Sequence, residues 1–215
     1  MNLEKIFNFI EQKRNYKKPL LYKLIKGIPL TEDELIINDD LFLQDMNITS
    51  LPDNLYVRGI LELSNTKITT LPDNLYVGGS LFLRRNNITS LPDNLKVGGS
   101  LNLRNTNITS LPDNLKVEGY LDLGNSNILE LPKNLYVAEW LSLRKTKITS
   151  LPDNLKVGWS LYLESTSISS IPNNLFVGET LFLRNTPLSD KYFEHDILNM
   201  IKEKGGSVRY GISII

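Results

Sequence analysis

The sequence predicts an α/β solenoid, in which short coils of chain stack on one another and each coil contacts only its neighbours. Three observations lead to this fold class. A unit of 20 residues recurs eight times from residue 31 to residue 190, although the first unit is degenerate. Each regular unit carries two leucines separated by one residue, such as Leu61 and Leu63, a spacing typical of a strand with one buried face. The two ends, 1–30 and 191–215, depart from the repeat.

Each regular unit divides into a strand and a return segment. Leucines two apart point to the same side of a strand, so we expect them to fill a continuous core with the Val57 and Ile68 positions. The segment Leu-Pro-Asp-Asn-Leu, which first begins at residue 51, returns by a turn or an extended path, because proline has no backbone donor. We expect the amide of Asn54, which is the same in every regular unit, to satisfy backbone groups of the turn. The polar column at Thr66 is predicted to bond between coils.

The N-terminal end of the stack is predicted to be a helical cap. A solenoid exposes its core at both ends unless terminal units cover it. Apolar residues from Leu3 to Ile10 fall on one face of a helix, and a second short helical stretch ends at Gly27. Residues 1–30 are therefore expected to form the N-terminal cap.

The C-terminal end is predicted to be a cap made of a helix and a final strand, over residues 191–215. The helix is expected to have Ser189 or Asp190 as its N-cap and Gly205 just past its end, because glycine suits the left-handed position there. The segment after it has the composition of a strand that closes the sheet edge. The eight repeats, 31–190, then lie between two caps.

The repeat resembles that of a known protein family. The pattern Leu-x-Leu-x-x-(Asn/Thr)-x-Ile-x-x-Leu-Pro is similar to the leucine-rich repeat, and its short length resembles the class found in secreted bacterial effectors and in proteins of bacteria and their phages. The resemblance covers residues 31–190, although Thr or Ser mostly replaces the usual Asn after the strand, and Val-x-Gly replaces an upstream leucine. It implies a curved parallel sheet on a concave face and a short irregular or 3-10 convex side. Most members of the family bind other proteins through the concave face.

Composition argues against catalysis. The 24 basic residues balance 24 acidic ones and cysteine is absent, which excludes disulfides, thiolate zinc sites and cysteine nucleophiles. The ubiquitin-ligase activity often joined to similar repeats needs a cysteine and is not expected here. Glu62 and Asp122 lie three strands apart, roughly 14 Å, which is too far for a paired acid and base. We expect a non-enzymatic, cytoplasmic protein without cofactor or metal, because no signal peptide or membrane-length apolar run is seen.

The positions that vary between units are candidates for binding, because the invariant ones are committed to packing. They flank and separate the two leucines on the exposed side of the strand. Aromatic residues occupy this side in four consecutive units and arginines follow the strands, and both types are enriched among interface hot spots. We therefore hypothesise that the concave face binds a protein partner. The candidate residues are Phe82, Arg84, Arg104, Tyr120, Trp140, Arg144, Tyr162, Phe182 and Arg184.

Other interpretations of this face stay open. The aromatic residues would also stabilise a sheet by stacking across strands without a ligand, and arginine stems often only cover a sheet surface. A nucleic acid or another polyanion would bind the arginines and stack on the aromatics, but Glu62, Asp122, Glu164 and the balanced net charge disfavour it. A structural role, as a rigid spacer or virion component, needs no single ligand. The sequence leaves the identity of the partner and the oligomeric state open.

Overall fold

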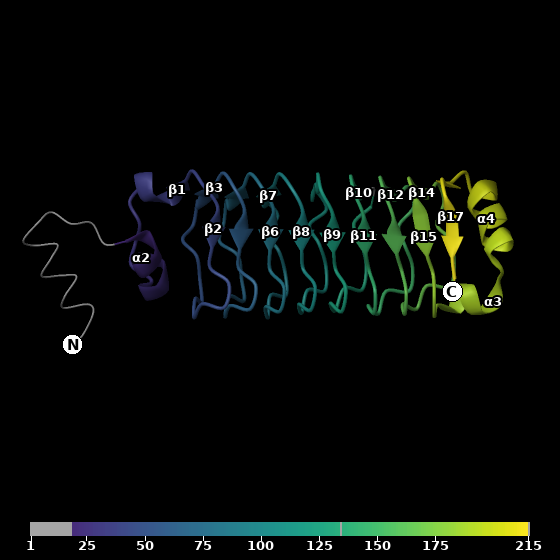
Figure 1. The fold of residues 1–215 in the computed structure, drawn as a ribbon, viewed down its shortest axis with the longest axis horizontal. Helices are drawn as coiled ribbons and strands as arrows, with labels where there is room; N and C mark the ends of the chain where they lie inside the picture. The colour runs from purple at the N-terminus through teal and green to yellow at the C-terminus, as the bar shows by residue number, and fades with distance from the viewer. Residues whose placement is uncertain (1–18, 134, 215) are drawn as a thin grey trace, which may run out of the picture.

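The structure is a computed structural model that describes residues 19–133 and 135–214. Its coils stack into an elongated solenoid, and a sheet of parallel strands runs along the stack (Figure 1). The helix expected from Leu3 to Ile10 lies outside the described residues, so the extent of the N-terminal cap, residues 1–30, stays a prediction. None of the helices in the described ranges combines the length and the apolar character needed to span a membrane.

The main sheet contains nine parallel strands, one from each coil and a closing strand. It forms because each coil repeats the Leu-x-Leu pattern in the same register, so that Leu61 pairs with Leu81 and each coil adds one strand. The spacing changes only at the last pair, where Leu181 pairs with Ile212. In spatial order the strands are β2 (Leu41–Phe42), β4 (Leu61–Glu62), β6 (Leu81–Phe82), β8 (Leu101–Asn102), β9 (Leu121–Asp122), β11 (Leu141–Ser142), β13 (Leu161–Tyr162), β15 (Thr180–Phe182) and β17 (Gly211–Ser213).

One hydrophobic core runs through the whole stack. Both leucines of each regular strand are buried, for example Leu61 and Leu63 at 0 % exposure, and so are the Val57 and Ile68 positions. Burying each such side chain contributes about 1.5–3 kcal/mol, so every coil is stabilised by the coils on either side of it. The core predicted from the repeat is confirmed at these positions, and the residues between the two leucines are left on the outer face.

A second parallel sheet, which the sequence analysis did not anticipate, lies next to the main one. Its strands in the regular coils are two residues long and bury only the valine, as in Tyr56–Val57. Only Arg58–Ile60 separate this strand from the main-sheet strand of the same coil, so these residues make a corner. The remainder of the coil, 63–75, is irregular, as expected. The second sheet consists of β1 (Ile36–Ile37), β3 (Tyr56–Val57), β5 (Tyr76–Val77) and β7 (Lys96–Val97), followed separately by β10 (Tyr136–Val137), β12 (Lys156–Val157), β14 (Phe176–Val177) and β16 (Ser207–Val208).

The second sheet is interrupted between β7 and β10, at the coil of residues 111–130. In four coils a glycine follows the valine of the second sheet, and a Cβ on that glycine would overlap a carbonyl oxygen of the preceding coil, as at Gly78 and Gly98. Glu118 occupies the same position in the interrupted coil, and Ala138 occupies it in the next one. A Cβ at this position does not by itself prevent pairing, because Arg58 N donates to Ile37 O at 2.9 Å and Ala138 N donates to Val117 O at 3.2 Å.

Two backbone hydrogen bonds are missing at this interruption, which we call the seam. Where the strands pair, the residues before and after the valine donate their N–H groups to the preceding coil, as Tyr76 and Gly78 do at 3.0 and 2.8 Å. Neither Lys116 nor Glu118 makes the corresponding bond to a described residue. A cavity of about 430 Å³ opens at the seam, with Lys96, Lys116 and Glu118 in its lining.

The Asn column of the turn forms a ladder between coils. Asn54 and Asn74 have φ values of 62° and 58°, and the amide of Asn74 donates to Asn54 Oδ1 at 3.0 Å. Asn94 continues the ladder by donating to Asn74 Oδ1 at 2.6 Å. The side chains therefore mainly bond to one another, whereas the prediction was that they bond to the backbone.

The Thr column makes hydrogen bonds within several coils. The hydroxyl of Thr106 donates to Leu103 O at 2.7 Å, and Thr146 and Thr166 make the same bond to the residue three positions earlier. The prediction that this column bonds between coils is therefore wrong for these threonines, because their hydroxyls are used locally where the strand ends. Asn86 does bridge two coils, by donating to Leu63 O at 3.0 Å.

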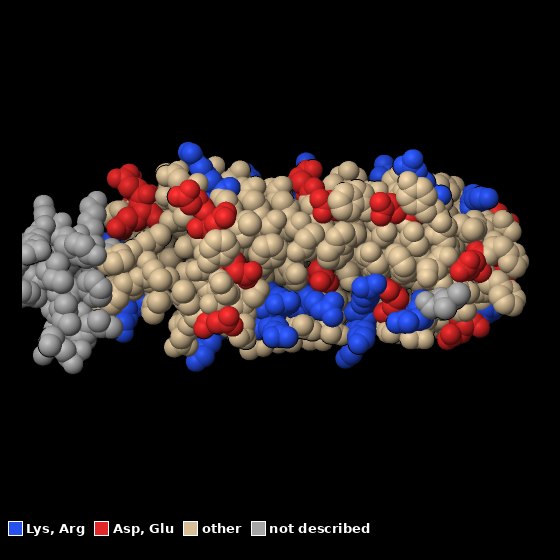
Figure 2. Space-filling model, viewed as in Figure 1, with Lys and Arg blue, Asp and Glu red and all other residues tan. Residues whose placement is uncertain are grey.

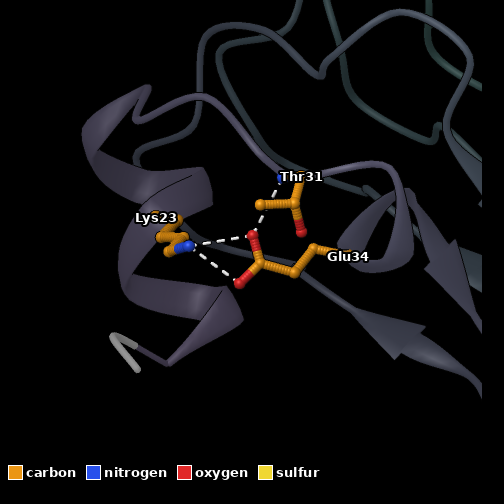
Figure 3. Close-up of polar contacts among 3 residues, drawn as sticks. All are labelled: Lys23, Thr31 and Glu34. Atoms are coloured by element: carbon orange, nitrogen blue, oxygen red, sulfur yellow. Dashed lines mark hydrogen bonds and ion pairs between the residues drawn. The ribbon is translucent and has the colours of Figure 1, made fainter. Parts of the chain in front are cut away.

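At the N-terminal end, an ion pair holds α2 (Leu20–Lys26) on η1 (Asp33–Leu35), as Figure 3 shows. Lys23 Nζ lies 2.7 Å from Glu34 Oε1, and the N–H of Thr31 donates to the same carboxylate at 3.0 Å. The hydrogen bond from Lys23 lowers the pKa of Glu34 from its ordinary value. The carboxylate therefore stays ionised, and the pair intact, at a more acidic pH than an isolated glutamate would allow.

At the C-terminal end, two helices follow the last regular coil. The prediction of one helix with its N-cap at Ser189 or Asp190 is wrong, because Thr186 is the N-cap and accepts a hydrogen bond from Ser189 N at 3.1 Å. Gly205, with φ of 76°, follows the second helix, as expected. The closing segment forms two strands, since β16 pairs with β14 and β17 with β15. The helices are α3 (Pro187–Lys191) and α4 (Glu194–Glu203).

Candidate interaction surface

The outward side chains of the main sheet form the surface on which the sequence places the candidate site, and we call it the main face. It has three columns: the residue before the first leucine, the one between the leucines, and the one after the second. Because the register is constant, each column is a row of side chains about 4.8 Å apart, and nine strands span roughly 38 Å. The side chains therefore stand at fixed positions on a rigid support.

Four aromatic residues, the aromatic cluster, are in contact across successive strands of the main face. Tyr120 and Trp140 stack with ring centroids 4.1 Å apart and an angle of 6° between ring planes. Trp140 meets Tyr162 edge-on at 6.1 Å, and Tyr162 stacks on Phe182 at 4.7 Å. All four are half-buried, so each keeps part of its ring open to a partner.

The aromatic cluster passes from the column before the leucines to the central column, because small residues lie next to its rings. Trp140 belongs to the column before the leucines, and the next member of that column is Ser160, which is buried. Tyr162 belongs to the central column, and the residue paired with it on the preceding strand is Ser142. A large ring therefore lies over a serine in both columns, which is why the cluster runs diagonally across the sheet.

Arg144 joins the aromatic cluster through its guanidinium. Its Cζ lies 4.2 Å from the centroid of the Tyr162 ring, and its Nη2 lies 2.6 Å from Glu164 Oε1. The hydrogen bond that Arg144 donates to Glu164 raises the pKa of Arg144, so the guanidinium stays charged. Beside it, Ser142 Oγ and Glu164 Oε2 are buried and have no hydrogen-bond partner within the described ranges. This part of the main face therefore has unmet hydrogen-bonding capacity.

The carboxylates of Glu62 and Asp122, considered above as an acid–base pair, accept hydrogen bonds from the backbone instead. Asp122, only 6 % exposed, and Glu62 each accept a hydrogen bond from the N–H two residues further on, at 2.9 and 2.8 Å. Sequence reasoning missed this role, although an acidic residue at the end of the strand, two positions before the turn, is a usable signal. Burial raises the pKa of the neighbouring Tyr120, whose phenol stays neutral. In the described ranges, no group of three or more His, Asp or Glu side chains could hold a metal ion.

Basic residues line the edge of the main sheet where the strands end. Figure 2 shows lysine and arginine side chains gathered along this edge, below β6 to β11. Most of them are exposed, and Arg144 is the one that forms an ion pair with a described residue. We call the group the basic edge. Its members are Arg84, Arg85, Arg104, Arg144, Lys145 and Arg184.

The remaining candidate residues lie apart from the aromatic cluster. Phe82 and Arg84 line a separate cavity of about 380 Å³ on the same face. Arg104 lies between the two places, and its Nη1 is 3.3 Å from the point that a Cβ on Gly124 would occupy. The absence of a side chain at Gly124 therefore leaves room for the guanidinium. Arg184 is exposed at the far end of the basic edge.

Sequence reasoning missed a row of aromatic side chains on the second sheet. Tyr56 and Tyr76 stack there with centroids 4.2 Å apart. Tyr136 and Phe176 continue the column and are 50 % and 45 % exposed. The available signal was the variable residue before each invariant valine, which is either aromatic or lysine.

Comparison with known proteins identifies the fold. No protein-family model matches the chain, and no curated protein matches it significantly. Among solved structures, the leucine-rich-repeat domain of a Shigella effector matches the whole chain with a TM-score of 0.57 and 23 % identity, over 97 % of that domain. YopM, a leucine-rich effector protein from Yersinia pestis, matches it with a TM-score of 0.56 and 17 % identity, and the match covers 60 % of YopM. The chain is therefore a parallel-strand solenoid with the bacterial type of leucine-rich-repeat fold.

Proposed function

We propose that this chain is a non-enzymatic protein-interaction module that binds a protein partner through the aromatic cluster and Arg144 on the main face. The observation that carries the proposal is the unbroken contact of four rings on four strands, with a guanidinium on one of them. Tryptophan, tyrosine and arginine contribute most of the binding energy at many protein interfaces. Because regular strands hold these side chains in place, little conformational entropy is lost on binding.

Stacking between strands does not by itself account for this group. Tyr56 and Tyr76 on the second sheet form such a stacked pair. On the main face the contacts extend over four strands, Arg144 covers a ring, and the orphan atoms Ser142 Oγ and Glu164 Oε2 lie beside it. A partner that supplies hydrogen bonds here would satisfy buried polar groups as well as cover the rings.

Capture of partners with matched variants tests the proposal. Wild-type protein and the Trp140→Ala/Tyr162→Ala variant are immobilised, incubated with cell lysate, and washed, and the retained proteins are quantified by mass spectrometry. We expect at least one protein to be retained by the wild type and reduced about tenfold or more on the variant, because truncating a hot-spot side chain costs about 2 kcal/mol or more.

The Tyr136→Ala/Phe176→Ala variant is the control, since it removes two aromatic side chains from the second sheet and leaves the main face intact. Circular dichroism and thermal melting verify that both variants are folded. Equal retention by wild type and the main-face variant would contradict the proposal. Retention of nucleic acid in place of protein, with an affinity that falls steeply with salt, would favour the polyanion interpretation.

A further inference from the structure

The basic edge carries a local positive charge in a protein whose 24 basic and 24 acidic residues balance. The two columns that follow the main strands contain six basic residues and two acidic ones, a local net charge of +4. Glu164 is paired with Arg144, and Asp45 lies beside the first strand, where it accepts a hydrogen bond from Asn65 at 2.6 Å. Within the described residues, the other five cations of the basic edge have no carboxylate paired with them. The edge is therefore suited to an acidic partner.

Three of the four arginines in the column after the second leucine are evenly spaced, and the fourth, Arg84, lies one strand before Arg104. Arg104, Arg144 and Arg184 belong to one column and alternate with Gly124 and Glu164, so successive arginines are two strands apart. At about 4.8 Å per strand, this separation is roughly 9.6 Å. A polyproline II helix repeats every three residues at about 3.1 Å each, a repeat of roughly 9.3 Å. In a β-strand, side chains on one face recur at roughly 6.7 Å, which does not match.

We propose that the partner of the main face presents an acidic segment in the polyproline II conformation, with a carboxylate at every third residue. The inference rests on the proposed function and narrows the chemistry of the partner. The carboxylates of the partner would bind Arg104, Arg144 and Arg184, while the other residues of the segment pack on the aromatic cluster. Polyproline II segments dock on aromatic surfaces in other domains, and arginine binds carboxylates with two parallel hydrogen bonds.

Two peptides of identical composition test this spacing. The first is (Glu-Pro-Pro)₅ with a fluorescein label, and the second has its five glutamates in one block followed by ten prolines. Both have the same charge and both favour polyproline II, so they differ only in the positions of the carboxylates. We expect fluorescence anisotropy to show that the spaced peptide binds about tenfold or more tightly than the block peptide.

Charge-reversal variants locate the binding. Arg104→Glu/Arg184→Glu is expected to weaken binding of the spaced peptide about tenfold or more. Lys96→Glu/Lys156→Glu changes the net charge equally but alters the second sheet, and it is expected to leave the affinity within about twofold. Equal affinity for the two peptides, an equal loss in both variants, or tighter binding of a 15-mer of thymidine would overturn the inference.

The outcomes separate this inference from the proposed function. If the Trp140→Ala/Tyr162→Ala variant loses a captured protein while neither peptide binds, the main face binds a partner of different chemistry, and only the inference on acidic spacing fails. If the capture experiment shows no difference and the peptides do not bind, both proposals fail. Binding of the spaced peptide that is weakened by Trp140→Ala/Tyr162→Ala supports both.

Discussion

The Asn of the turn meets two structural demands with one side chain. Its backbone is left-handed in several coils, with φ between 54° and 62° at Asn54, Asn74, Asn154 and Asn174. Asparagine tolerates this region better than most residues, and its amide can donate to one neighbour and accept from another. Glycine would meet only the backbone demand, and aspartate could accept but not donate. The two demands together account for asparagine in the coils where both are present, such as those of Asn54 and Asn74.

Two substitutions at Asn74 separate these demands. Asn74→Gly keeps the left-handed backbone and removes two ladder bonds, whereas Asn74→Ala also places a Cβ in a disfavoured conformation. We expect a loss of about 1 kcal/mol in the free energy of unfolding for glycine and about 2–3 kcal/mol for alanine. Urea unfolding at 25 °C measures both. Equal losses would mean that the ladder alone matters.

At the scale of elements, the residue that follows each second-sheet valine varies between coils. The second sheet continues where that residue is Gly98 or Gly158 and stops at the coil that carries Glu118. The main sheet is unaffected, since Leu101 N still donates to Tyr120 O at 2.8 Å. At this coil the second sheet is therefore open while the main sheet stays closed.

Glu118→Gly is expected to close the seam. Two backbone hydrogen bonds would form, each worth about 0.5–1.5 kcal/mol, against an entropy cost of about 0.5–1 kcal/mol for the glycine. The expected net gain in the free energy of unfolding is about 1 kcal/mol, with slower hydrogen exchange at the Lys116 amide. Glu118→Ala is the control because it removes the charge and keeps the Cβ. Equal protection of Lys116 in both variants would show that charge, and not the Cβ, opens the seam.

The predictability of each element follows from how many of its residues are buried. The main sheet and the core could be predicted because Leu61 and Leu63 mark a strand with both leucines buried in every coil. The second-sheet strands bury one residue of two, so they show no alternation from which a strand could be inferred. The aromatic cluster was predictable from register alone. The pairing of Arg144 with Glu164 was not, because it depends on side-chain conformation.

At the scale of the whole molecule, the stack is held together by contacts between neighbouring coils. Every coil from residue 51 to residue 190 presents the same core positions to the next, so one coil can replace another in the stack. Stability in such a solenoid is close to a sum of coil and junction contributions. The number of coils is therefore not fixed by the fold.

Removal of a whole coil tests this additivity. Deletion of residues 91–110 keeps the register, so we expect a folded protein with a reduced melting temperature and a length shorter by about 4.8 Å. Deletion of residues 91–100 puts leucines out of register and is expected to prevent folding of the stack. Circular dichroism and small-angle X-ray scattering distinguish the outcomes. Similar melting of the two deletion variants would argue against register as the determinant.

The seam also determines how the molecule can bend. The main sheet is continuous across it, whereas the second sheet lacks two of its hydrogen bonds there, so we expect resistance to bending to be lowest at this junction. The two parts of the stack on either side of the seam are therefore expected to bend about the main sheet. Tyr120, the first ring of the aromatic cluster, belongs to the coil at that junction. Flexing there would change the angle between the Arg84 end of the molecule and the aromatic cluster, so the protein could adjust the curvature of its main face to a partner without unfolding a coil.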